Sequence, residues 1–598
     1  MGRRQNDQLC ILGQRFKSVG MSRRNFFKIS AAAAAGTVVT GGMERYVGSN
    51  VLAAPRPAIR MQEVGPDEKF YEYGRRDDPV TFDWNLNLYA EAEPRTAAGL
   101  LTFDADLNAI PDWAETFTPN EDTSVWTFNI RPDNVGWTNG SETRPVTAHD
   151  FVFSWERQLN PANGAAYAAF LFDVKNAEKY NLGEEGITGA DLGVVALDDW
   201  TLEVTMEGPR AYFPQVVAYY ASVPSPQWAI EEYGSERWAS GEVPLWVNGP
   251  FKLDRWEHDV VLELSPNPGY WDAESVHVKK VYEPIIPAES AVLAYERGEG
   301  NQRLDWVTVS AADLDRFRED PELSEQLKNY VYPGIWMLVP SNGMEPFQND
   351  EVGLKVRRAL SHAIDRSRLV EVTNGLSAEA FCMVPTGVYG YIDDPEIAAI
   401  QAFDPALAME QLVGTPYEGG QNWPEITMHM RGQEEVYNSN LMANDIVAQL
   451  QENLGMNINI QVWPEASWRP ELFKNEFQLV WIRWWYDYPD PNNGYGDMFY
   501  SKKSSGKRQA WSNAEFDNLV DQGKGVADPE ERLEVYKQAE RVIQEDVGYI
   551  PVVYRVDQNA FKPWVKDVAV NRQGFWIPET NMYVGILTDV RIEGRPEE

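Results

Sequence analysis

Residues 126–161 read WTFNIRPDNVGWTNGSETRPVTAHDFVFSWERQLNP, and this stretch predicts a strand, a turn and a helix in that order. Trp126, Phe128 and Ile130 alternate with polar residues, which is the pattern of a half-buried strand. Asn139-Gly140 then has the composition of a turn. The first half of the stretch therefore predicts a strand that packs one face on a core.

The second half of the same stretch predicts a helix with defined ends. Thr147 and Asp150 have the three-residue spacing of a capping box, in which each side chain accepts a backbone hydrogen bond from the other end of the first turn. Asn160-Pro161 predicts where the helix stops, because the residue before a proline avoids helical geometry. Strand, turn and helix together indicate a unit of a packed α/β domain.

The wording of this stretch is similar to the signature block of the family 5 extracellular solute-binding proteins, the peptide-type receptors of ABC importers. Further segments resemble other blocks of that family and follow in the family's order: 191–206 (DLGVVALDDWTLEVTM), 248–271 (NGPFKLDRWEHDVVLELSPNPGYW), 356–369 (VRRALSHAIDRSRL), 484–491 (WWYDYPDP), and 562–565 (KPWV) with 581–583 (NMY). Any one match is weak because it is short. Six in the right order, spread over nearly all of the chain after its leader, are strong.

The resemblance implies an α/β fold of two lobes, as in the large type II periplasmic binding proteins of cluster C. It places the chain's two crossings between the lobes at residues 282–287 and 552–559. The implied division is a leader at 1–54, a first lobe at 55–283 with an accessory subdomain at about 99–193, a second lobe at 284–557, and a return to the first lobe at 558–598. A length of 598 residues also favours two or three packed units.

Two helices are predicted in the second lobe from the residues themselves. Apolar residues recur at helical spacing from Val352 to Ile364, and Gly375 closes this run. We expect Arg357 there to be solvated or structural. Asp528-Pro529 predicts the start of a second long helix.

The sequence is strongly acidic, with a formal net charge of −38. The first 54 residues hold eight Lys and Arg against two acids, which leaves 45 basic and 89 acidic residues in the remainder. Such a surface repels nucleic acid and anionic membranes, so we expect no nucleic acid partner. Solubility, or a salty or acidic medium, is the simpler explanation of this charge, and attraction of cationic solutes towards a cleft is the other.

The N-terminal segment resembles a Tat export signal. Arg23-Arg24 is followed by Phe26, by Lys28 and by the alanine-rich, weakly apolar run Ile29–Thr40, and small residues at Val51–Ala54 suit a signal peptidase. We therefore expect an exported protein, located in the periplasm or at the outer face of the cytoplasmic membrane. The Tat translocase is the expected export partner.

The sequence supports no catalytic or metal-binding motif. The five histidines have no metal-ligand spacing, and there is no GxSxG elbow, P-loop or dinucleotide-binding glycine motif. We expect neither a cofactor nor a metal. A secreted glycoside hydrolase is the alternative from the enzyme class, because 89 acids after the leader always allow some catalytic pair to be drawn.

The strongest candidate site is the segment 481–491, WIRWWYDYPDP, which holds two acids and five aromatic residues. One interpretation is a buried strand that ends in a proline-rich turn. The functional interpretation uses the same geometry, because the strand edge offers main-chain groups to an extended peptide and Asp487 at its end meets the peptide's ammonium group.

By the resemblance, Asp487 matches the acid that grips the peptide's α-ammonium group, and the residues just before it match the strand that pairs with the peptide. Residues 90–92 match the facing edge of the cleft less closely, and Trp468 is a candidate wall of a side-chain pocket. The candidate ligand-binding residues are Arg483, Trp484, Trp485, Tyr486, Asp487, Tyr488, Trp468, Glu91 and Ala92.

Two departures from the family pattern bear on the ligand. Arg483 stands where close relatives carry a small residue, and Trp481 stands where some members carry a basic residue for the peptide's carboxylate. A longer, non-peptidic or cationic ligand, or an oligosaccharide stacked on the tryptophans, is therefore an alternative to a short peptide. The expected partners are an ABC permease with its cytoplasmic ATPase, and we expect the receptor to be a monomer.

Overall fold

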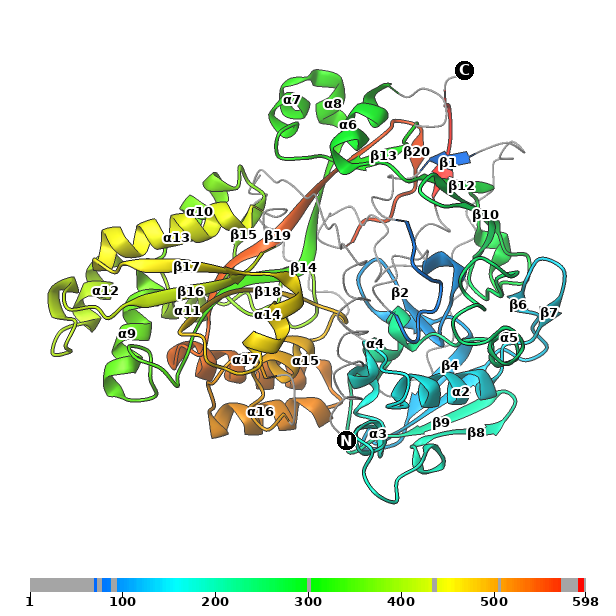
Figure 1. Ribbon diagram of the computed structural model, residues 1–598, viewed down its shortest axis with the longest axis horizontal. Coiled ribbons are helices and arrows are strands. Elements are labelled where there is room, and N and C mark those ends of the chain that lie inside the picture. Colours follow the sequence, from blue (N-terminus) through cyan, green and yellow to red (C-terminus); the bar gives the residue numbers. More distant parts are fainter. Residues whose placement is uncertain are drawn as a thin grey trace, which may run out of the picture.

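The computed structural model describes residues 69–71, 78–87, 94–297, 303–432, 438–503, 507–571 and 590–595. The predicted leader, with Arg23, Arg24, Phe26 and Lys28, lies outside the described residues, as do Glu91, Ala92 and residues 581–583. Among the helices that are described, none combines the length and the apolar character needed to cross a membrane. The chain forms two α/β lobes, with helices and sheets on both sides of a central region (Figure 1).

The first lobe begins with a small antiparallel sheet in the order β4-β5-β9-β8. The strands of this region are β2 (Leu101–Phe103), β3 (Ala109–Pro111), β4 (Ala114–Pro119), β5 (Val125–Ile130), β6 (Trp137–Thr138), β7 (Thr143–Arg144), β8 (Val194–Asp198) and β9 (Thr201–Thr205). Trp126, Phe128 and Ile130 are buried on β5 while the residues between them are more exposed, which confirms the predicted strand. The predicted strand pair in 191–206 is β8 and β9.

The helix predicted after this strand is α2 (Ala148–Leu159). Its capping box is present: Thr147 is the N-cap, its backbone N–H donates to Asp150 Oδ2 at 2.8 Å, and the Thr147 side chain accepts from the backbone of the first turn. Asn160 is the C-cap, as predicted. The remaining helices of this lobe are α3 (Ala177–Asn181), α4 (Phe213–Val217) and α5 (Gln227–Tyr233), with short 3-10 turns η1 (Pro94–Thr96), η2 (Ala168–Leu171), η3 (Gly189–Asp191), η4 (Tyr220–Ser222) and η5 (Ala273–Ser275).

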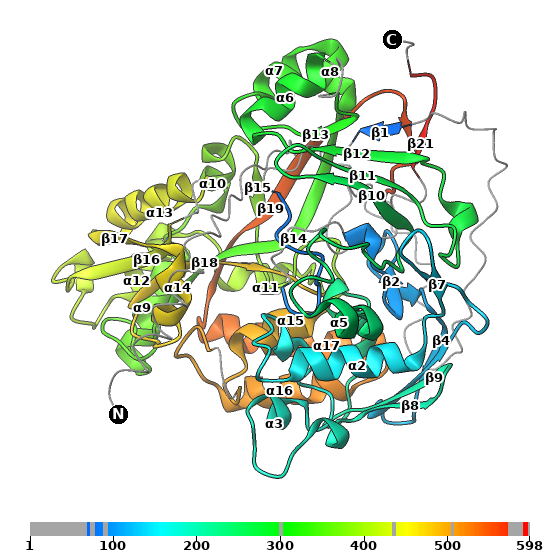
Figure 2. The same cartoon turned by 45° about the vertical axis from the view of Figure 1, so that its right-hand side comes forward.

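A second sheet of the first lobe has the order β1-β12-β11-β10. Its strands are β1 (Lys69–Tyr71), β10 (Phe251–Glu257), β11 (Val261–Pro266) and β12 (Lys280–Pro284). The hairpin predicted in 248–271 is the antiparallel pair β10 and β11. Figure 2 shows this sheet in the upper part of the first lobe and strands β4, β8 and β9 in its lower part.

The second lobe is built on one seven-stranded mixed sheet of order β13-β19-β14-β18-β16-β17, with β15 paired to β19. Its strands are β13 (Trp306–Thr308), β14 (Leu327–Pro340), β15 (Ser377–Glu379), β16 (Ile426–Arg431), β17 (Ile458–Trp463), β18 (Leu479–Trp485) and β19 (Ile550–Phe561). All residues of β19 are buried, because strands flank it on both edges and helices cover the sheet. A further short pair joins β20 (Val565–Lys566) and β21 (Arg591–Ile592).

The helices of the second lobe pack on both faces of this sheet (Figure 1). They are α6 (Ala288–Arg297), α7 (Leu314–Glu319), α8 (Pro321–Gln326), α9 (Glu351–His362), α10 (Arg366–Val372), α11 (Pro395–Ile400), α12 (Pro405–Gln411), α13 (Ser439–Leu454), α14 (Glu465–Leu472), α15 (Pro491–Gly494), α16 (Ala514–Gly525) and α17 (Pro529–Glu545), with a 3-10 turn η7 (Glu418–Gly420). The helix predicted at Asp528-Pro529 is α17, and Asp528 caps it.

The prediction of one helical run from Val352 to Gly375 is wrong in one respect. It forms two helices, α9 and α10, because Asp365 caps a new helix by accepting from the backbone N–H of Ser367. Arg357 is structural rather than solvated: its side chain is fully buried and donates to the carbonyl groups of Phe347, Gln348 and Asp546.

Candidate ligand-binding site

The candidate site lies where β18 ends, in the central region between the lobes (Figure 1). β18 pairs with β14 along its whole length, from Leu479 opposite Pro340 to Trp485 opposite Gly334. Trp481 is buried and stacks on Trp336 at 5.4 Å, so one face of the strand belongs to the core. The prediction of a buried strand is confirmed.

The opposite edge of β18 is only partly used. Within the described residues, β16 pairs with β18 at two positions alone, Met428 with Leu479 and His429 with Val480. In the described part of the chain, β14 is thus the strand that pairs with β18 along residues 481–485. An open edge of this kind presents backbone N–H and C=O groups that an extended chain can bind.

Asp487 follows this edge and meets two phenols from the first lobe. Its Oδ1 accepts hydrogen bonds from the hydroxyl groups of Tyr167, at 3.2 Å, and of Tyr219, at 3.5 Å. Each tyrosine stands immediately before a one-turn 3-10 helix, η2 or η4, which fixes its backbone. The carboxylate is thus shared between the two lobes, because it belongs to one and its hydrogen-bond donors belong to the other.

The environment of Asp487 raises its pKa to about 6 from an ordinary value of 3.8. Burial is the main cause, since it disfavours the charged form, and the nearby charge of Asp497 is the second. The hydrogen bond from Tyr167 and the positive charges of Arg508 and Arg469 act in the opposite direction. The site therefore holds an anion that would gain from a cationic partner.

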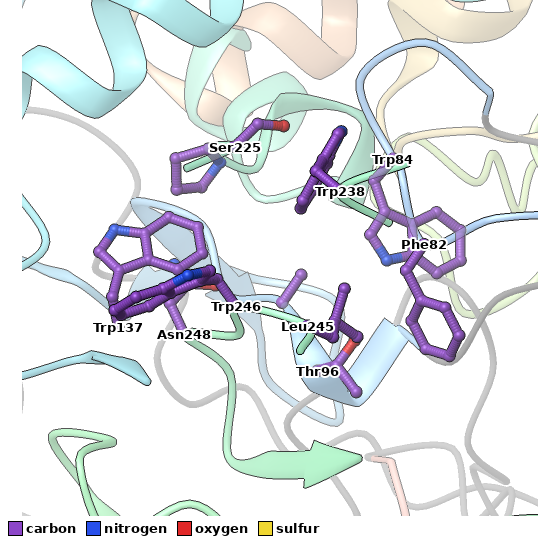
Figure 3. A pocket seen from close by; sticks show the side chains of 11 residues that line it. Phe82, Trp84, Thr96, Trp137, Ser225, Trp238, Leu245, Trp246 and Asn248 are labelled. Atoms are coloured by element: carbon purple, nitrogen blue, oxygen red, sulfur yellow. The ribbon is translucent and has the colours of Figure 1, made fainter. Parts of the chain in front are cut away.

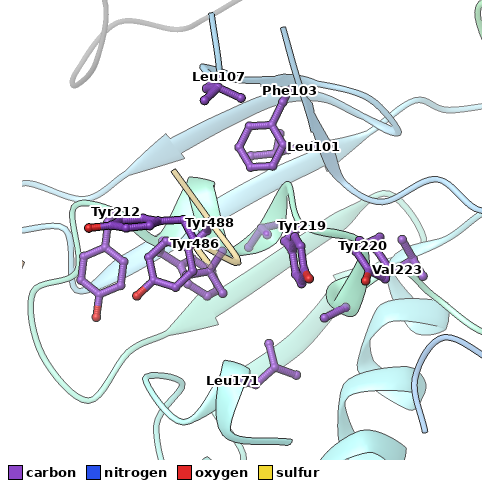
Figure 4. Close-up of a cluster of buried hydrophobic side chains, with 14 of the residues drawn as sticks. Leu101, Phe103, Leu107, Leu171, Tyr212, Tyr219, Tyr220, Val223, Tyr486 and Tyr488 are labelled. Carbon is purple, nitrogen blue, oxygen red and sulfur yellow. The ribbon is translucent and has the colours of Figure 1, made fainter. Parts of the chain in front are cut away.

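Aromatic rings enclose the carboxylate from the side of the first lobe. Phe170 stacks on Tyr219 at 5.0 Å and meets the edge of Tyr488 at 5.6 Å. Tyr212 lies parallel to Tyr488, with ring centroids 5.9 Å apart (Figure 4). Rings from residues 167–219 thus pack directly on Tyr488, which is buried. Asp487 itself is half-buried.

A second contact joins the lobes next to these rings. The backbone N–H of Ala211 donates to the carbonyl of Lys524 at 2.8 Å, at the end of α16. The preceding residue, Arg210, forms an ion pair with Asp173 of the first lobe. The segment 209–212 is therefore docked on the second lobe.

The side chains around Asp487 are held by polar contacts on the second lobe. Trp484 Nε1 donates to Asn493 Oδ1 at 2.8 Å, so the indole has a fixed orientation. Tyr488 donates its hydroxyl to Asp497 Oδ2 at 3.0 Å, and Asn493 Nδ2 donates to the same oxygen at 3.3 Å. The Asp497 carboxylate therefore anchors Tyr488 directly and Trp484 through Asn493.

The other candidate residues occupy varied positions around the site. Trp485 is half-buried, and Arg483 lies over its ring at 5.0 Å. Tyr486 is buried and donates to the carbonyl of Met383. Trp468, on α14, is 4% exposed and stacks on Phe477 at 5.8 Å, so it packs in the core of the second lobe. Glu91 and Ala92 lie outside the described residues.

Sequence reasoning missed the two tyrosines of the first lobe that bind Asp487. Tyr167 is 320 residues away from it in the sequence and Tyr219 is 268 residues away. No spacing pattern links residues at such separations. The only local signal is the cluster of aromatic residues between Tyr167 and Phe172, just after the helix that the signature block predicts.

A separate small cavity lies in the first lobe and is lined by tryptophans (Figure 3). Its volume is about 20 Å³, which suits about one water molecule and is far too small for a peptide. Trp84 Nε1 is buried at its wall with no hydrogen-bond partner in the described structure. The lining residues are Phe82, Trp84, Thr96, Ala97, Trp137, Pro224, Ser225, Trp238, Leu245, Trp246 and Asn248.

Metal binding finds no support in the described part of the chain, where no group of three or more His, Cys, Asp and Glu residues could hold an ion. His429 is half-buried, and this partial burial lowers its pKa to about 4. Its Nδ1 accepts from the indole N–H of Trp463, so it is a neutral core residue.

Comparison of the sequence with known proteins identifies its family. The family described as bacterial extracellular solute-binding proteins, family 5, middle region, matches residues 108–506. The oligopeptide-binding protein OppA of Bacillus subtilis is 28% identical over 499 residues, which are 81% of this chain and 86% of the relative. The periplasmic OppA of Salmonella typhimurium is 29% identical over 479 residues, which are 78% of this chain and 83% of the relative.

A solved structure extends the likeness to the fold of both lobes. The unliganded open form of the periplasmic murein tripeptide-binding protein MppA superposes with a TM-score of 0.72, at 23% identity, over 88% of this chain and 98% of that chain. The match to the family covers well over half of the sequence and includes β18 and Asp487, which follows it. The chain therefore belongs to the bacterial extracellular solute-binding proteins of family 5.

Proposed function

We propose that this protein is an exported receptor that captures peptides by their free N-terminus and delivers them to an ABC importer. The observation that carries the proposal is the half-buried carboxylate of Asp487, placed at the end of an open strand edge and reached by two phenols from the other lobe. Relatives named as oligopeptide-binding proteins support a peptide as the ligand.

Peptide capture uses two features of the site. An extended peptide adds to the open edge at residues 481–485, and its main-chain hydrogen bonds contribute affinity whatever its side chains are. The ammonium group then meets Asp487, whose carboxylate is already bonded by the hydroxyl of Tyr167. The phenol oxygen has lone pairs left over, so it serves as a second acceptor for the same ammonium group.

Delivery requires that the receptor enclose its ligand. We propose that the chain crosses at residues 282–287 and 552–559 between a first lobe at 55–283 and 558–598 and a second lobe at 284–557. The second crossing lies within the long strand β19, whose last residues still pair with β13 and β14. The sheet that contains β12 ends at Pro284, and β13 of the next sheet begins at Trp306, which supports the first of these boundaries. To shift the ratio of closed to open molecules from 1:99 to 99:1, the ligand must bind the closed form more tightly by about 5.5 kcal/mol.

Export is the remaining part of the proposal. We infer that Arg23-Arg24 directs the precursor to the Tat translocase and that the mature receptor acts outside the cytoplasmic membrane as a monomer. Two periplasmic binding proteins among the relatives support the location. Members of the family bind solutes rather than transform them, so we propose that this chain has no enzymatic activity.

Calorimetry with matched ligands tests the proposal. Tri-alanine should bind the mature protein, and N-acetyl-tri-alanine should bind much more weakly, because acetylation removes the charge that Asp487 attracts. Maltotriose and a chromogenic glycoside panel serve as controls for a sugar receptor and a hydrolase. Equal binding of both peptides, or binding and turnover of the sugars alone, would refute the amine-binding receptor.

Native mass spectrometry of the freshly purified protein complements these titrations. It identifies any ligand that is retained from the cell, and a series of peptide masses is the expected result.

A further inference from the structure

Asp497 occupies an unusual position beside the proposed ammonium site. It lies in a five-residue π-helical turn, Tyr495–Phe499, that follows α15. Such turns are rare and occur often at functional sites. The turn places the Asp497 carboxylate where it accepts hydrogen bonds from Tyr488 and from Asn493.

These two bonds connect Asp497 to both sides of Asp487. Tyr488 follows Asp487 directly, and Asn493 in turn fixes the indole of Trp484. Asp497 itself is half-buried, and Lys503 donates to its backbone carbonyl at 3.0 Å. A carboxylate in this position orients the aromatic walls and also adds a second negative charge to the site.

The charges around the pair show how the second carboxylate acts. The charged or titratable groups that face Asp487 are Tyr167, Tyr219, Asp497, Arg469 and Arg508. Those that face Asp497 are Tyr488, Lys503, Asp173 and Lys524. The pKa of each carboxyl group is raised, mainly by burial, and the negative charge of Asp497 raises the pKa of Asp487 further.

We propose, on the basis of the proposed function, that Asp497 is a positioning residue for the ligand's cation. It orients Tyr488 directly and Trp484 through Asn493, and its charge adds to the effect of burial in making capture of a primary ammonium group depend on pH in the mildly acidic range. A receptor built in this way holds its ligand at neutral pH and releases it on acidification.

The direction of the pH effect follows from the titration of Asp487. With a pKa of about 6, its carboxylate is charged above that pH and neutral well below it. A cationic ligand stabilises only the charged form, so its affinity should fall about tenfold for each pH unit below about pH 6. It should also decrease near pH 8, where the α-amino group of the peptide itself loses its proton. An unperturbed aspartate would show the same fall only near pH 3.8.

The experiment measures the affinity for tri-alanine from pH 4.5 to 8 in the wild type and in Asp497→Asn. The substitution keeps the shape and an acceptor oxygen for Tyr488 while it removes the charge. The midpoint should move down from about 6 while burial still keeps it above 3.8, so the variant should lose less affinity at pH 5 than the wild type does. Asp521→Asn is the control. Asp521 lies on the neighbouring helix α16 and pairs with Lys502, so loss of its charge should leave the midpoint unchanged.

Tyr488→Phe is a second variant that separates orientation from charge. It removes the 3.0 Å hydrogen bond and leaves both carboxylates, so it should weaken binding of tri-alanine at every pH without moving the midpoint downwards. A wild-type midpoint near 4, or an equal midpoint in the wild type and Asp497→Asn, would overturn the role of Asp497 while amine-dependent binding stands. Equal binding of free and acetylated peptide would instead refute the proposed function itself.

Discussion

Replacement of Asp487 by Asn is the most direct perturbation of the proposed site. The amide has the shape of the carboxylate and retains one oxygen for the hydroxyl of Tyr167, so the contact between the lobes is preserved. What is lost is the negative charge. A free-amine peptide should therefore bind the variant more weakly, whereas an acetylated peptide should be little affected because its charge is already absent.

The size of the effect can be worked out from the surroundings of the carboxylate. At pH 7.5 a group with a pKa of about 6 is about 97% ionised, so nearly every site carries the charge. The rise in the pKa of Asp487 from 3.8 to about 6 means that its surroundings disfavour the charged form by about 3 kcal/mol, which an ammonium group would offset. Truncation of buried charge pairs costs about 2 to 5 kcal/mol, so we expect a coupling of about 3 kcal/mol, or about 150-fold in affinity.

Isothermal titration calorimetry on four combinations measures this coupling directly: wild type and Asp487→Asn, each with tri-alanine and N-acetyl-tri-alanine. Asp133→Asn is a matched control, since Asp133 is exposed in a turn with φ of 55°, a conformation that asparagine tolerates. It should bind tri-alanine like the wild type. Equal losses for the two peptides in Asp487→Asn would refute the reasoning and leave Asp487 as a structural residue of the turn.

Three further predictions concern export, motion and stability. Replacing both Arg23 and Arg24 by Lys should leave the precursor inside the cell, as fractionation and immunoblotting would show, and normal export in a Tat-competent host would contradict the signal. Saturating tri-alanine should reduce the radius of gyration in small-angle scattering with an unchanged circular dichroism spectrum, and an unchanged radius would argue against a closing cleft. Asp490→Asn should lower the free energy of unfolding, measured in urea, by about 3 to 5 kcal/mol. The reason is that the buried guanidinium of Arg532, which donates to the Asp490 carboxylate at 2.6 and 2.7 Å, loses its anion. A loss below about 1 kcal/mol would show that the pair is not important for stability.

Much of the local structure was predictable because it depends on short spacings. The alternation in Trp126–Ile130 and the capping box at Thr147 are set by neighbouring residues, and the structure has both as predicted. The strand that ends before Asp487 was predictable for the same reason. The break between α9 and α10 was not, because the apolar spacing continues through it and only the capping oxygen of Asp365 ends the run.

The partners of the candidate site could not be predicted, because they come from distant parts of the chain. Tyr167 and Tyr219 reach Asp487 only once the two lobes are packed together. The family resemblance pointed to the acid and the strand, but not to what touches them. Asp497 looked like an ordinary acid in a sequence with 91 acids, and only the π-helical turn brings it to Tyr488.

The open edge of β18 also bears on how this protein avoids self-association. An unpaired strand edge is a template for aggregation, since it pairs with any exposed strand of another molecule. Here the edge spans only residues 481–485, Trp481, Ile482 and Trp484 are buried, and Pro489 follows closely. A strand of another folded protein would have to pair with this short edge beside the rings of the first lobe that pack on Tyr488, whereas a short flexible chain can adapt to them. The same geometry that admits a small ligand would thus act as a filter against proteins, and it would keep a strongly acidic receptor soluble at high concentration.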